Sequence, residues 1–373
     1  MTAPEHLLDR VRDRIAEEWS RDPAPAAGSA PADHLPPAAG ELRDDLLGAG
    51  PLQPLLSAPD TTDVLVNSPS EVWVDRGGGL ERTAVRFPDT AALRRLAQRL
   101  ACAAGRRLDD AHPWVDARLP DGTRLHAVLP PIAVGSPHLS LRVVRHRPFT
   151  PAELVATDTL PPGGERLLRA VLGARLSFLI SGGTGSGKST LLSCLLGLVG
   201  PRERIVLVED SAELRPAHPH VVRLETRPAN QEGVGRVGTA ELVRQALRMR
   251  PDRLVVGEVR GAEVLDLLAA MNTGHEGGCG TVHANAADAV PARLEALAAA
   301  AGMPRPALHS QLAAAVDLVV HLRRDPSDGR RRVTEIHLFE RGPDGLVRTV
   351  PALRRAPAGF VREAAWPRLE ALL

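Results

Sequence analysis

The sequence predicts an α/β protein in which a mostly parallel sheet with helices on both faces follows a smaller α+β domain. From about residue 165 onward, short apolar runs alternate with stretches of helical periodicity, which is typical of parallel strands joined by helical crossovers. Between about residues 41 and 146, short strand-like runs separated by turn sequences surround one helical stretch at 90–104. This pattern of short strands around one helix favours a separate α+β unit.

The strongest local signal lies at residues 182–190, where GGTGSGKST fits the pattern G-x-x-x-x-G-K-[ST]. An apolar run at 176–180 predicts a buried strand before it, and leucines spaced as one helix face follow it. In such a turn, backbone N–H groups converge on an anion and the helix dipole adds partial positive charge. We therefore expect it to hold the phosphates of a nucleotide. The predicted phosphate-binding residues are Gly182, Gly183, Thr184, Gly185, Ser186, Gly187, Lys188, Ser189 and Thr190.

Two side chains of this stretch have predicted roles of their own. Lys188 should reach the β- and γ-phosphates, and Ser189 should hold a Mg²⁺ ion. Lys188 is the only lysine in the chain, although Lys and Arg together number 46. A compact ammonium fits between phosphate oxygens in a tight loop, whereas a planar guanidinium is too wide.

The overall composition narrows the class of protein. The 373 residues carry a net charge of +1, so neither a basic nucleic-acid footprint nor an acidic tail dominates. The three cysteines lack metal-ligand spacing, and no signal segment or membrane-spanning apolar run is present. We expect a cytoplasmic protein that touches membranes only through partners. Aromatic residues make up 2%, which disfavours a stacking platform for single-stranded nucleic acid.

Composition shifts divide the chain into four segments. Residues 1–40 combine an amphipathic pattern with a Pro/Ala-rich linker. Residues 41–146 are the α+β domain, and the proline-rich stretch 147–164 is predicted to be a hinge. Residues 165–373 form the phosphate-binding domain.

Carboxylates follow two predicted strands of the larger domain. Glu209, Asp210 and then Glu213 follow one apolar run, and Glu258 follows another. Groups at the carboxyl edge of a parallel sheet face the phosphate crevice. There they could bind the metal's water shell or orient the attacking water, or they could be solvated loop acids. Glutamate at position 258 suits the water-polarising role.

A histidine is a further candidate. His283 lies in a predicted strand, where a neutral imidazole could hydrogen-bond a γ-phosphate, although such a histidine is more often a core residue. Gly277, Gly278 and Gly280 before it predict a mobile loop, and His275 is a weaker candidate in the same loop.

Arginines supply the remaining candidates. Arg124 and Arg142 lie on strands of the smaller domain, where they could clamp phosphate or serve as surface charges. Five arginines of the larger domain could include a finger for a neighbouring subunit's nucleotide or could be ion-paired, and spacing does not choose among them. They are Arg223, Arg227, Arg248, Arg250 and Arg253.

Taken in order, these motifs resemble the type II/IV secretion ATPase superfamily and, within it, the Tad/Flp pilus assembly ATPases, or secretion-system protein E. The resemblance covers the chain from about residue 42 to beyond residue 322. It rests on GPLQPLL, DVLVN, LPDGTRLHAVLPP, GGTGSGKST, VEDSAEL, VRLETRP, LRMRPDRLVVGEVRGAEVLDLLAAMNTGHEG and TVHAN. The sequence departs from the family at GGCGTVHAN, near Cys279, which bears on the dynamics of that loop.

The resemblance implies a RecA-like P-loop NTPase C-terminal domain with a smaller α+β N-terminal domain, and nucleotide held between the two. It implies a hexameric ring motor at the cytoplasmic face of a membrane. It also implies an acidic box, a Walker B glutamate and a histidine box, here Glu209, Asp210 and Glu213, then Glu258, then His283. Arg124 and Arg142 match phosphate-contacting arginines of the family, and the implied interface arginines are Arg227, Arg248 and Arg260.

The residues and the resemblance together predict hydrolysis of ATP by in-line attack of water. Glu258 or Glu209 would orient the water, and Ser189, Asp210 and Glu258 would serve the Mg²⁺ ion. The expected partners are further copies of the chain in a homo-hexamer, a polytopic membrane platform protein and, indirectly, pilin-like cargo, without direct nucleic-acid binding. Two alternatives stay open: a nucleic-acid-translocating motor of a conjugation-type system, and a low-turnover nucleotide-binding scaffold.

Overall fold

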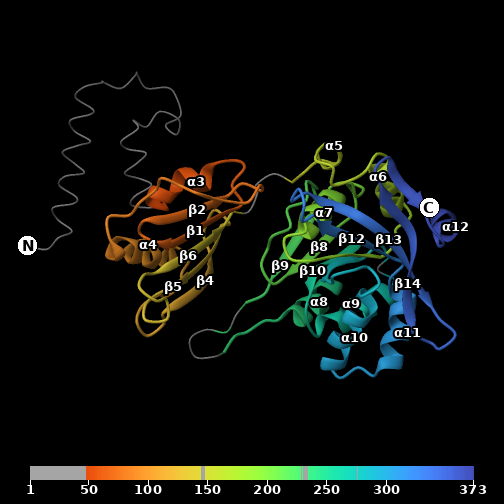
Figure 1. Ribbon diagram of the computed structural model, residues 1–373. Coiled ribbons are helices and arrows are strands. Elements are labelled where there is room, and N and C mark those ends of the chain that lie inside the picture. Colours follow the sequence, from red (N-terminus) through yellow and green to blue (C-terminus); the bar gives the residue numbers. More distant parts are fainter. Residues whose placement is uncertain (1–47, 144–147, 228, 230–233, 275) are drawn as a thin grey trace, which may run out of the picture. The chain divides into compact units, whose positions relative to one another are not determined.

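The computed structural model of the chain describes residues 48–143, 148–227, 229, 234–274 and 276–373 (Figure 1). By its internal contacts the chain divides into two units, Met1–Arg145 and His146–Leu373. The amphipathic segment and linker predicted for residues 1–40 lie outside the described residues. Across the described ranges, every helix is too short or too polar to cross a membrane.

The first unit contains a six-stranded antiparallel sheet in the order β3-β2-β1-β6-β5-β4. Its described elements are η1 (Gly50–Leu52), α3 (Gln53–Ser57), β1 (Asp63–Ser68), β2 (Glu71–Asp75), β3 (Leu80–Arg82), α4 (Thr90–Ala103), β4 (Trp114–Arg118), β5 (Arg124–Val128) and β6 (His138–Arg142). The central strands alternate buried and more exposed residues, as expected for a sheet with one face on the core.

Helix α4 covers the buried face of this sheet. Asp89 caps its first turn by accepting a hydrogen bond from Ala92 N at 2.6 Å. Leu93, Leu96 and Leu100, spaced along one helix face, are buried in the core that the sheet completes. The helix predicted at 90–104 is confirmed, and the α+β character of this unit with it.

The second unit is built on a nine-stranded sheet in the order β15-β14-β13-β12-β7-β11-β10-β8-β9. Its strands are β7 (Phe178–Gly182), β8 (Ile205–Glu209), β9 (Val221–Glu225), β10 (Arg253–Val259), β11 (Cys279–His283), β12 (Leu318–Arg324), β13 (Arg331–Arg341), β14 (Val347–Ala356) and β15 (Gly359–Arg362). Its helices are α5 (Pro151–Ala156), α6 (Gly164–Gly173), α7 (Lys188–Leu196), α8 (Thr239–Leu247), α9 (Glu263–Asn272), α10 (Val290–Ala300), α11 (Arg305–Ala315) and α12 (Trp366–Leu372).

Helices cover both faces of this sheet, as predicted (Figure 1). One core contains apolar side chains of α6, α7 and α12, and the other contains those of α8, α9, α10 and α11. The strands from β12 to β9 in the sheet order pair in parallel. The predicted α/β class is therefore confirmed.

The strands nearest the end of the chain do not continue the predicted pattern of parallel strands joined by helices. Strands β12, β13, β14 and β15 pair antiparallel. Parallel neighbours need a crossover of about a dozen residues or more, and the chain between β12 and β13 spans only residues 325–330. A hairpin is the connection that so short a turn allows.

From residue 148 onward, the stretch predicted to be a hinge (147–164) belongs to the second unit. Leu154 and Leu160 are both 2% exposed and belong to that unit's core. Thr150 and Glu153 form a capping box at the start of α5, with Pro151 in its first turn. Pro151 lies at a helix start, where proline is well tolerated, and Leu154 and Leu160 of this stretch pack with the second unit.

The glycines predicted to form a mobile loop before His283 are in part strand residues. Gly280 lies inside β11, where a Cβ would sit 2.8 Å from Val256 O. Gly278 O accepts a hydrogen bond from Phe178 N, at the start of β7, 3.1 Å away. The stretch therefore lies at the amino ends of these strands, opposite the edge where β7 meets α7. Close packing between strands explains the glycine at 280, and His275 lies outside the described residues.

Candidate active site

The phosphate-binding stretch has the predicted strand–turn–helix form. Strand β7 ends at Gly182 and helix α7 begins at Lys188. Gly185 and Gly187 have φ values of +70° and +96°, a region that glycine enters readily. A Cβ on Gly182 would lie 2.5 Å from Leu322 O, so the neighbouring strand β12 leaves no room for a side chain there.

Lys188 is held within the turn. Its Nζ donates hydrogen bonds to Gly182 O and Gly183 O, each at 3.0 Å, and the residue is 9% exposed. Burial lowers the pKa of this ammonium, the charges of Glu258 and Glu213 oppose the shift, and Arg260 adds to it. The structure therefore brings the predicted phosphate-binding lysine near two of the predicted carboxylates.

The hydroxyl side chains of the turn differ in exposure. Thr184 and Thr190 are exposed, and Ser189 is half-buried in the first turn of α7. Ser186 is 2% exposed, and its Oγ has no hydrogen-bond partner among the described residues. A buried hydroxyl without a partner is unusual in a native fold, which makes this turn a place where an incoming acceptor would be stabilised.

Glu258 lies near the carboxyl end of β10, with a side chain that is 26% exposed. Arg260 Nη2 donates to Glu258 Oε2 at 2.6 Å, and this contact raises the pKa of the Arg260 guanidinium. The family resemblance implies that Arg260 acts across a subunit interface. Within this chain it forms an ion pair with the predicted catalytic carboxylate.

Glu209, at the end of β8, is 4% exposed and holds the loop that follows it. Its Oε1 accepts from Glu213 N at 3.0 Å and from Leu214 N at 2.9 Å, whereas its Oε2 has no partner among the described residues. Burial raises its pKa to about 7, although the two backbone hydrogen bonds oppose the shift. A Cβ on Gly257 would lie 2.7 Å from Glu209 Cγ, so glycine at that position makes room for this carboxylate.

Asp210 is exposed and joins two loops. Its Oδ1 accepts from Thr239 Oγ1, in the first turn of α8, at 2.6 Å, and its backbone O accepts from Thr226 Oγ1 at 3.0 Å. The predicted metal ligand therefore has one side-chain oxygen in a hydrogen bond that fixes the start of α8.

His283 is the last residue of β11 and pairs with Gly182 in the parallel register of β11 and β7. It is half-buried, beside the residue at which the phosphate-binding turn starts. Strand pairing thus brings together two predicted site residues that are about 100 positions apart in the sequence.

The remaining candidate arginines fall into different surroundings. Arg124 and Arg142 are direct neighbours on β5 and β6 of the first unit, and Arg142 Nε donates to Asp63 Oδ1 at 3.1 Å. Arg227 Nε donates to Gly235 O at 2.7 Å and so closes its own loop, while Arg248 is exposed at the end of α8.

Arg253 is a structural residue. It is 2% exposed, its Nε lies 2.9 Å from Glu203 Oε2, and its Nη2 donates to Leu172 O at 2.8 Å. Of the two interpretations left open for the five arginines of this domain, the ion-paired one holds for Arg253.

The sequence motifs did not indicate two contacts at the turn, which come from His321 on β12 and Arg331 on β13. Arg331 Nε donates to Gly185 O at 2.8 Å. His321 Nδ1 lies 2.8 Å from Ser181 Oγ, one residue before the turn. The pairing of β12 with β7, and of β13 with β12, brings these positions to the phosphate-binding stretch.

Replacing His321 with asparagine is expected to reduce the loss of stability on acidification. Burial lowers the pKa of His321 below its ordinary value of 6.5, although Glu335 opposes the shift. As the pH falls through 6.5, the unfolded chain takes up a proton that the native imidazole resists, and the native state is destabilised. Asparagine keeps a polar atom near the position of Nδ1 but does not titrate.

Thermal unfolding at about pH 8 and about pH 5.5 checks this prediction. The fall in Tm between the two values should be smaller in the variant than in the unmodified chain. His337, whose pKa burial also lowers, is present in both proteins, so the comparison reports the change at position 321. An equal fall in both would contradict the role given to His321.

Comparisons with known proteins agree with this geometry. The family described as "Type II/IV secretion system protein" matches residues 45–352. A putative conjugal transfer protein of Mycobacterium tuberculosis is 59% identical over 315 residues, which cover 83% of this chain and 89% of the relative. The type IV secretion system protein PtlH of Bordetella pertussis is 34% identical over 314 residues, covering 76% of this chain and 92% of PtlH.

Among solved structures, the ATPase DotB of Yersinia pseudotuberculosis is similar with a TM-score of 0.54 and 17% identity. The match covers 93% of this chain and 84% of that one. At this identity the likeness concerns the fold alone. The family match and the two relatives show that the chain belongs to the type II/IV secretion system protein family, and it is an ATPase of that family.

Proposed function

We propose that this ATPase drives the assembly of a pilus or a type II/IV secretion apparatus. The observation that carries the proposal is the phosphate-binding turn with Lys188 fixed inside it and the Glu258 carboxylate near its ammonium. A turn of this kind next to a strand-end carboxylate is the arrangement that phosphoryl transfer to water needs.

Each residue has a proposed part in the chemistry. The turn binds the phosphates through its N–H groups, and Lys188 neutralises charge that develops on the γ-phosphoryl group. Glu258 orients the attacking water, with Glu209 as the rival for this role, and His283 contacts the γ-phosphate. Arg124, Arg142, Arg227, Arg248 and Arg260 are proposed phosphate or interface contacts in the assembled ring.

The donor set near the turn suits a Mg²⁺ ion. Ser189 lies in the first turn of α7, while Asp210 and Glu258 lie at the carboxyl ends of β8 and β10. Hydroxyl and carboxylate oxygens are the ligands that Mg²⁺ prefers, together with phosphate oxygens and water. When bound, the ion would neutralise phosphate charge, and we propose these three residues as its protein ligands.

The proposed working form is a ring of six identical chains at the cytoplasmic face of a membrane. There the ring would act on a polytopic membrane platform protein, and through it on pilin-like cargo. Membership of the secretion family supports a membrane partner.

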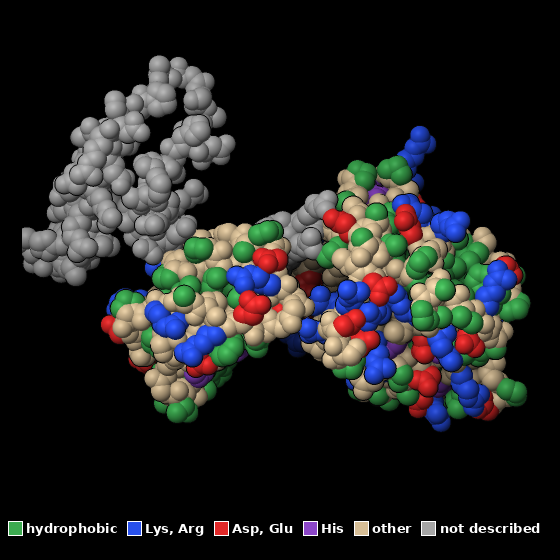
Figure 2. All heavy atoms as spheres, turned by 45° about the horizontal axis from the view of Figure 1, so that its top comes forward, with side chains coloured by type: hydrophobic (Ala, Val, Ile, Leu, Met, Phe, Trp, Pro, Cys, Tyr) green, Lys and Arg blue, Asp and Glu red, His purple; other side chains and the backbone are tan. Residues whose placement is uncertain are grey.

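A second candidate function is translocation of nucleic acid in a conjugation-type system. The name of the relative with 59% identity, a putative conjugal transfer protein, favours it. The net charge of +1 weighs against it. On the face drawn in Figure 2, basic and acidic side chains are intermixed over both units rather than gathered in a basic stripe.

Two measurements on the full chain separate the candidates. Affinity purification of the tagged chain from membranes should recover a polytopic protein, and the ATPase rate with Mg²⁺ should stay unchanged when DNA is added. A rate that rises several-fold with DNA would favour the conjugation-type motor. Nucleotide binding without measurable turnover, even with the membrane fraction restored, would favour a regulatory scaffold.

A further inference from the structure

The peptide unit between Gly185 and Ser186 has its orientation fixed from outside the turn. Arg331 Nε, on β13, donates to Gly185 O at 2.8 Å. A trans peptide points its C=O and its N–H in opposite directions. The same unit turns Ser186 N towards Gly183 O, 3.3 Å away, which also accepts from Lys188 Nζ. Arg331 thus holds the carbonyl on one side while the N–H faces the lysine side.

This peptide unit needs an external support. Gly185 has a φ of +70°, and a Cβ there would meet nothing within 4 Å. Since it has no side chain, and there is open space where one would lie, Gly185 can rotate its peptide at little cost. A hydrogen bond from a charged donor is stronger than one from a neutral donor. The Arg331 contact is therefore suited to keeping this peptide in one orientation, and with it the shape of the turn.

The β12–β13 hairpin touches the turn at two further points. A Cβ on Gly187 would lie 3.3 Å from Arg331 Cδ, and one on Gly182 would lie 2.5 Å from Leu322 O. Both ends of the turn therefore lie against this hairpin, and its position affects the shape of the whole turn.

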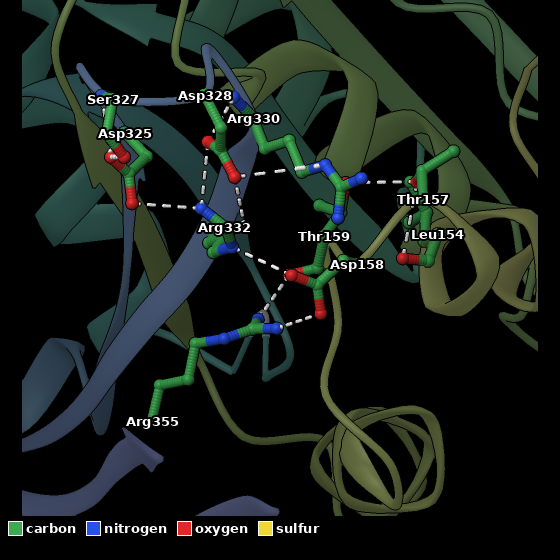
Figure 3. A network of polar contacts seen from close by, with 10 residues as sticks. All are labelled: Leu154, Thr157, Asp158, Thr159, Asp325, Ser327, Asp328, Arg330, Arg332 and Arg355. Carbon is green, nitrogen blue, oxygen red and sulfur yellow. Dashed lines mark hydrogen bonds and ion pairs between the residues drawn. The ribbon is translucent and has the colours of Figure 1, made fainter. Parts of the chain in front are cut away.

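The residue next to Arg331 anchors the hairpin in a cluster of charges (Figure 3). Arg332 pairs with Asp158 Oδ2 at 2.8 Å, with Asp325 Oδ2 at 2.9 Å and with Asp328 Oδ2 at 2.6 Å. Arg355 Nη2, from β14, pairs with Asp158 Oδ1. These five residues form what we call the Arg332 cluster. Its side chains come from three separate parts of the chain.

The backbone beside Asp158 is fixed to the same hairpin. Val333 N donates to Thr159 O at 2.9 Å, and Arg355 Nη1 donates to the same oxygen at 3.3 Å. Neighbouring residues 331 and 332 thus connect the phosphate-binding turn on one side with the segment between α5 and α6 on the other.

We propose that Arg331 is a positioning residue for nucleotide binding: it fixes the Gly185–Ser186 peptide and so the shape of the phosphate-binding turn, while the Arg332 cluster holds the hairpin that carries Arg331. Arg331 acts through the turn and not on the reacting atoms. Its loss should therefore weaken the binding of ATP and ADP by a common factor and leave the chemical step nearly unchanged.

The test compares Arg331→Gln, Arg331→Lys and a matched control, Arg348→Gln. Arg348 pairs with Asp344 at the β13–β14 turn. The two residues are four positions apart, as are Arg332 and Asp328. Arg348 lies outside the Arg332 cluster. For Arg331→Gln we expect the KM for ATP and the Kd for ADP to rise about five- to tenfold, the loss of about one hydrogen bond. The kcat should stay within about twofold and the nucleotide-free Tm within about 2 °C. Arg331→Lys should recover most of the affinity, since it retains a charged donor.

Asp158→Asn supplies the second variant, because asparagine tolerates the φ of +62° found at this position. It removes the charge shared by Arg332 and Arg355 and should raise the KM in the same direction by a smaller factor. An unchanged KM in Arg331→Gln, a fall in kcat larger than the change in KM, or an equal change in Arg348→Gln would overturn the proposal. If Arg331→Gln does not yield folded protein, a normal KM for ATP in Asp158→Asn would overturn the proposal.

Discussion

Replacing Glu258 with glutamine is expected to lower the rate of ATP hydrolysis by about 10²- to 10⁴-fold while ATP still binds within a few-fold of normal. Glutamine keeps the size and one acceptor oxygen of the side chain but cannot take or share a proton. The carboxylate lies near the carboxyl end of β10, and its negative charge acts to raise the pKa of the Lys188 ammonium in the phosphate-binding turn. Steady-state turnover and binding of a fluorescent ATP analogue measure the two quantities separately.

Glu209→Gln is the informative comparison, because Glu209 is the rival for the same role. Its carboxylate oxygen Oε1 accepts two backbone N–H groups, and glutamine can keep both of these bonds. We expect a much smaller fall in kcat for this variant. If Glu209→Gln abolished turnover and Glu258→Gln did not, the two roles would have to be exchanged.

Replacing Lys188 with arginine is expected to weaken ATP binding roughly 100-fold or more, nearly as much as replacement with alanine. The Lys188 ammonium lies 3.0 Å from both Gly182 O and Gly183 O, and the residue is only 9% exposed. A guanidinium is planar and wider, so it cannot occupy this position without displacing the turn. Calorimetric titration with ATP and Mg²⁺ gives the affinity of each variant.

The control for this experiment is the nucleotide-free protein. Both variants should unfold cooperatively near the Tm of the unmodified chain, while the rise in Tm that ATP causes should disappear. An arginine variant that binds ATP normally would show that charge alone, and not the shape of the ammonium, is what this position requires.

Much of the fold was predictable because its signals are local. The pattern at residues 182–190 and the apolar runs before the carboxylates gave β7, α7, β8 and β10 nearly as observed. Strand ends of a parallel sheet meet at one edge, so Glu258 could be placed near Lys188 from order alone. The Glu258–Arg260 pair was not predicted, because two residues at a strand end can point in several directions.

Other features depend on contacts between distant positions. Arg331 lies 146 positions from Gly185, and no motif marks it among the arginines of the chain. The proline-rich stretch 147–164 suggested a linker by composition, but its leucines lie in a core that only the folded sheet creates. Gly280 likewise suggested mobility, whereas its neighbour across the sheet, Val256, explains it.

The seclusion of Lys188 has a practical consequence for chemical labelling. An amine-directed acylating reagent finds a single side-chain target on this molecule, the ammonium that two carbonyls of the turn enclose. Covalent modification at that one site then reports how often the turn opens, without any engineered probe.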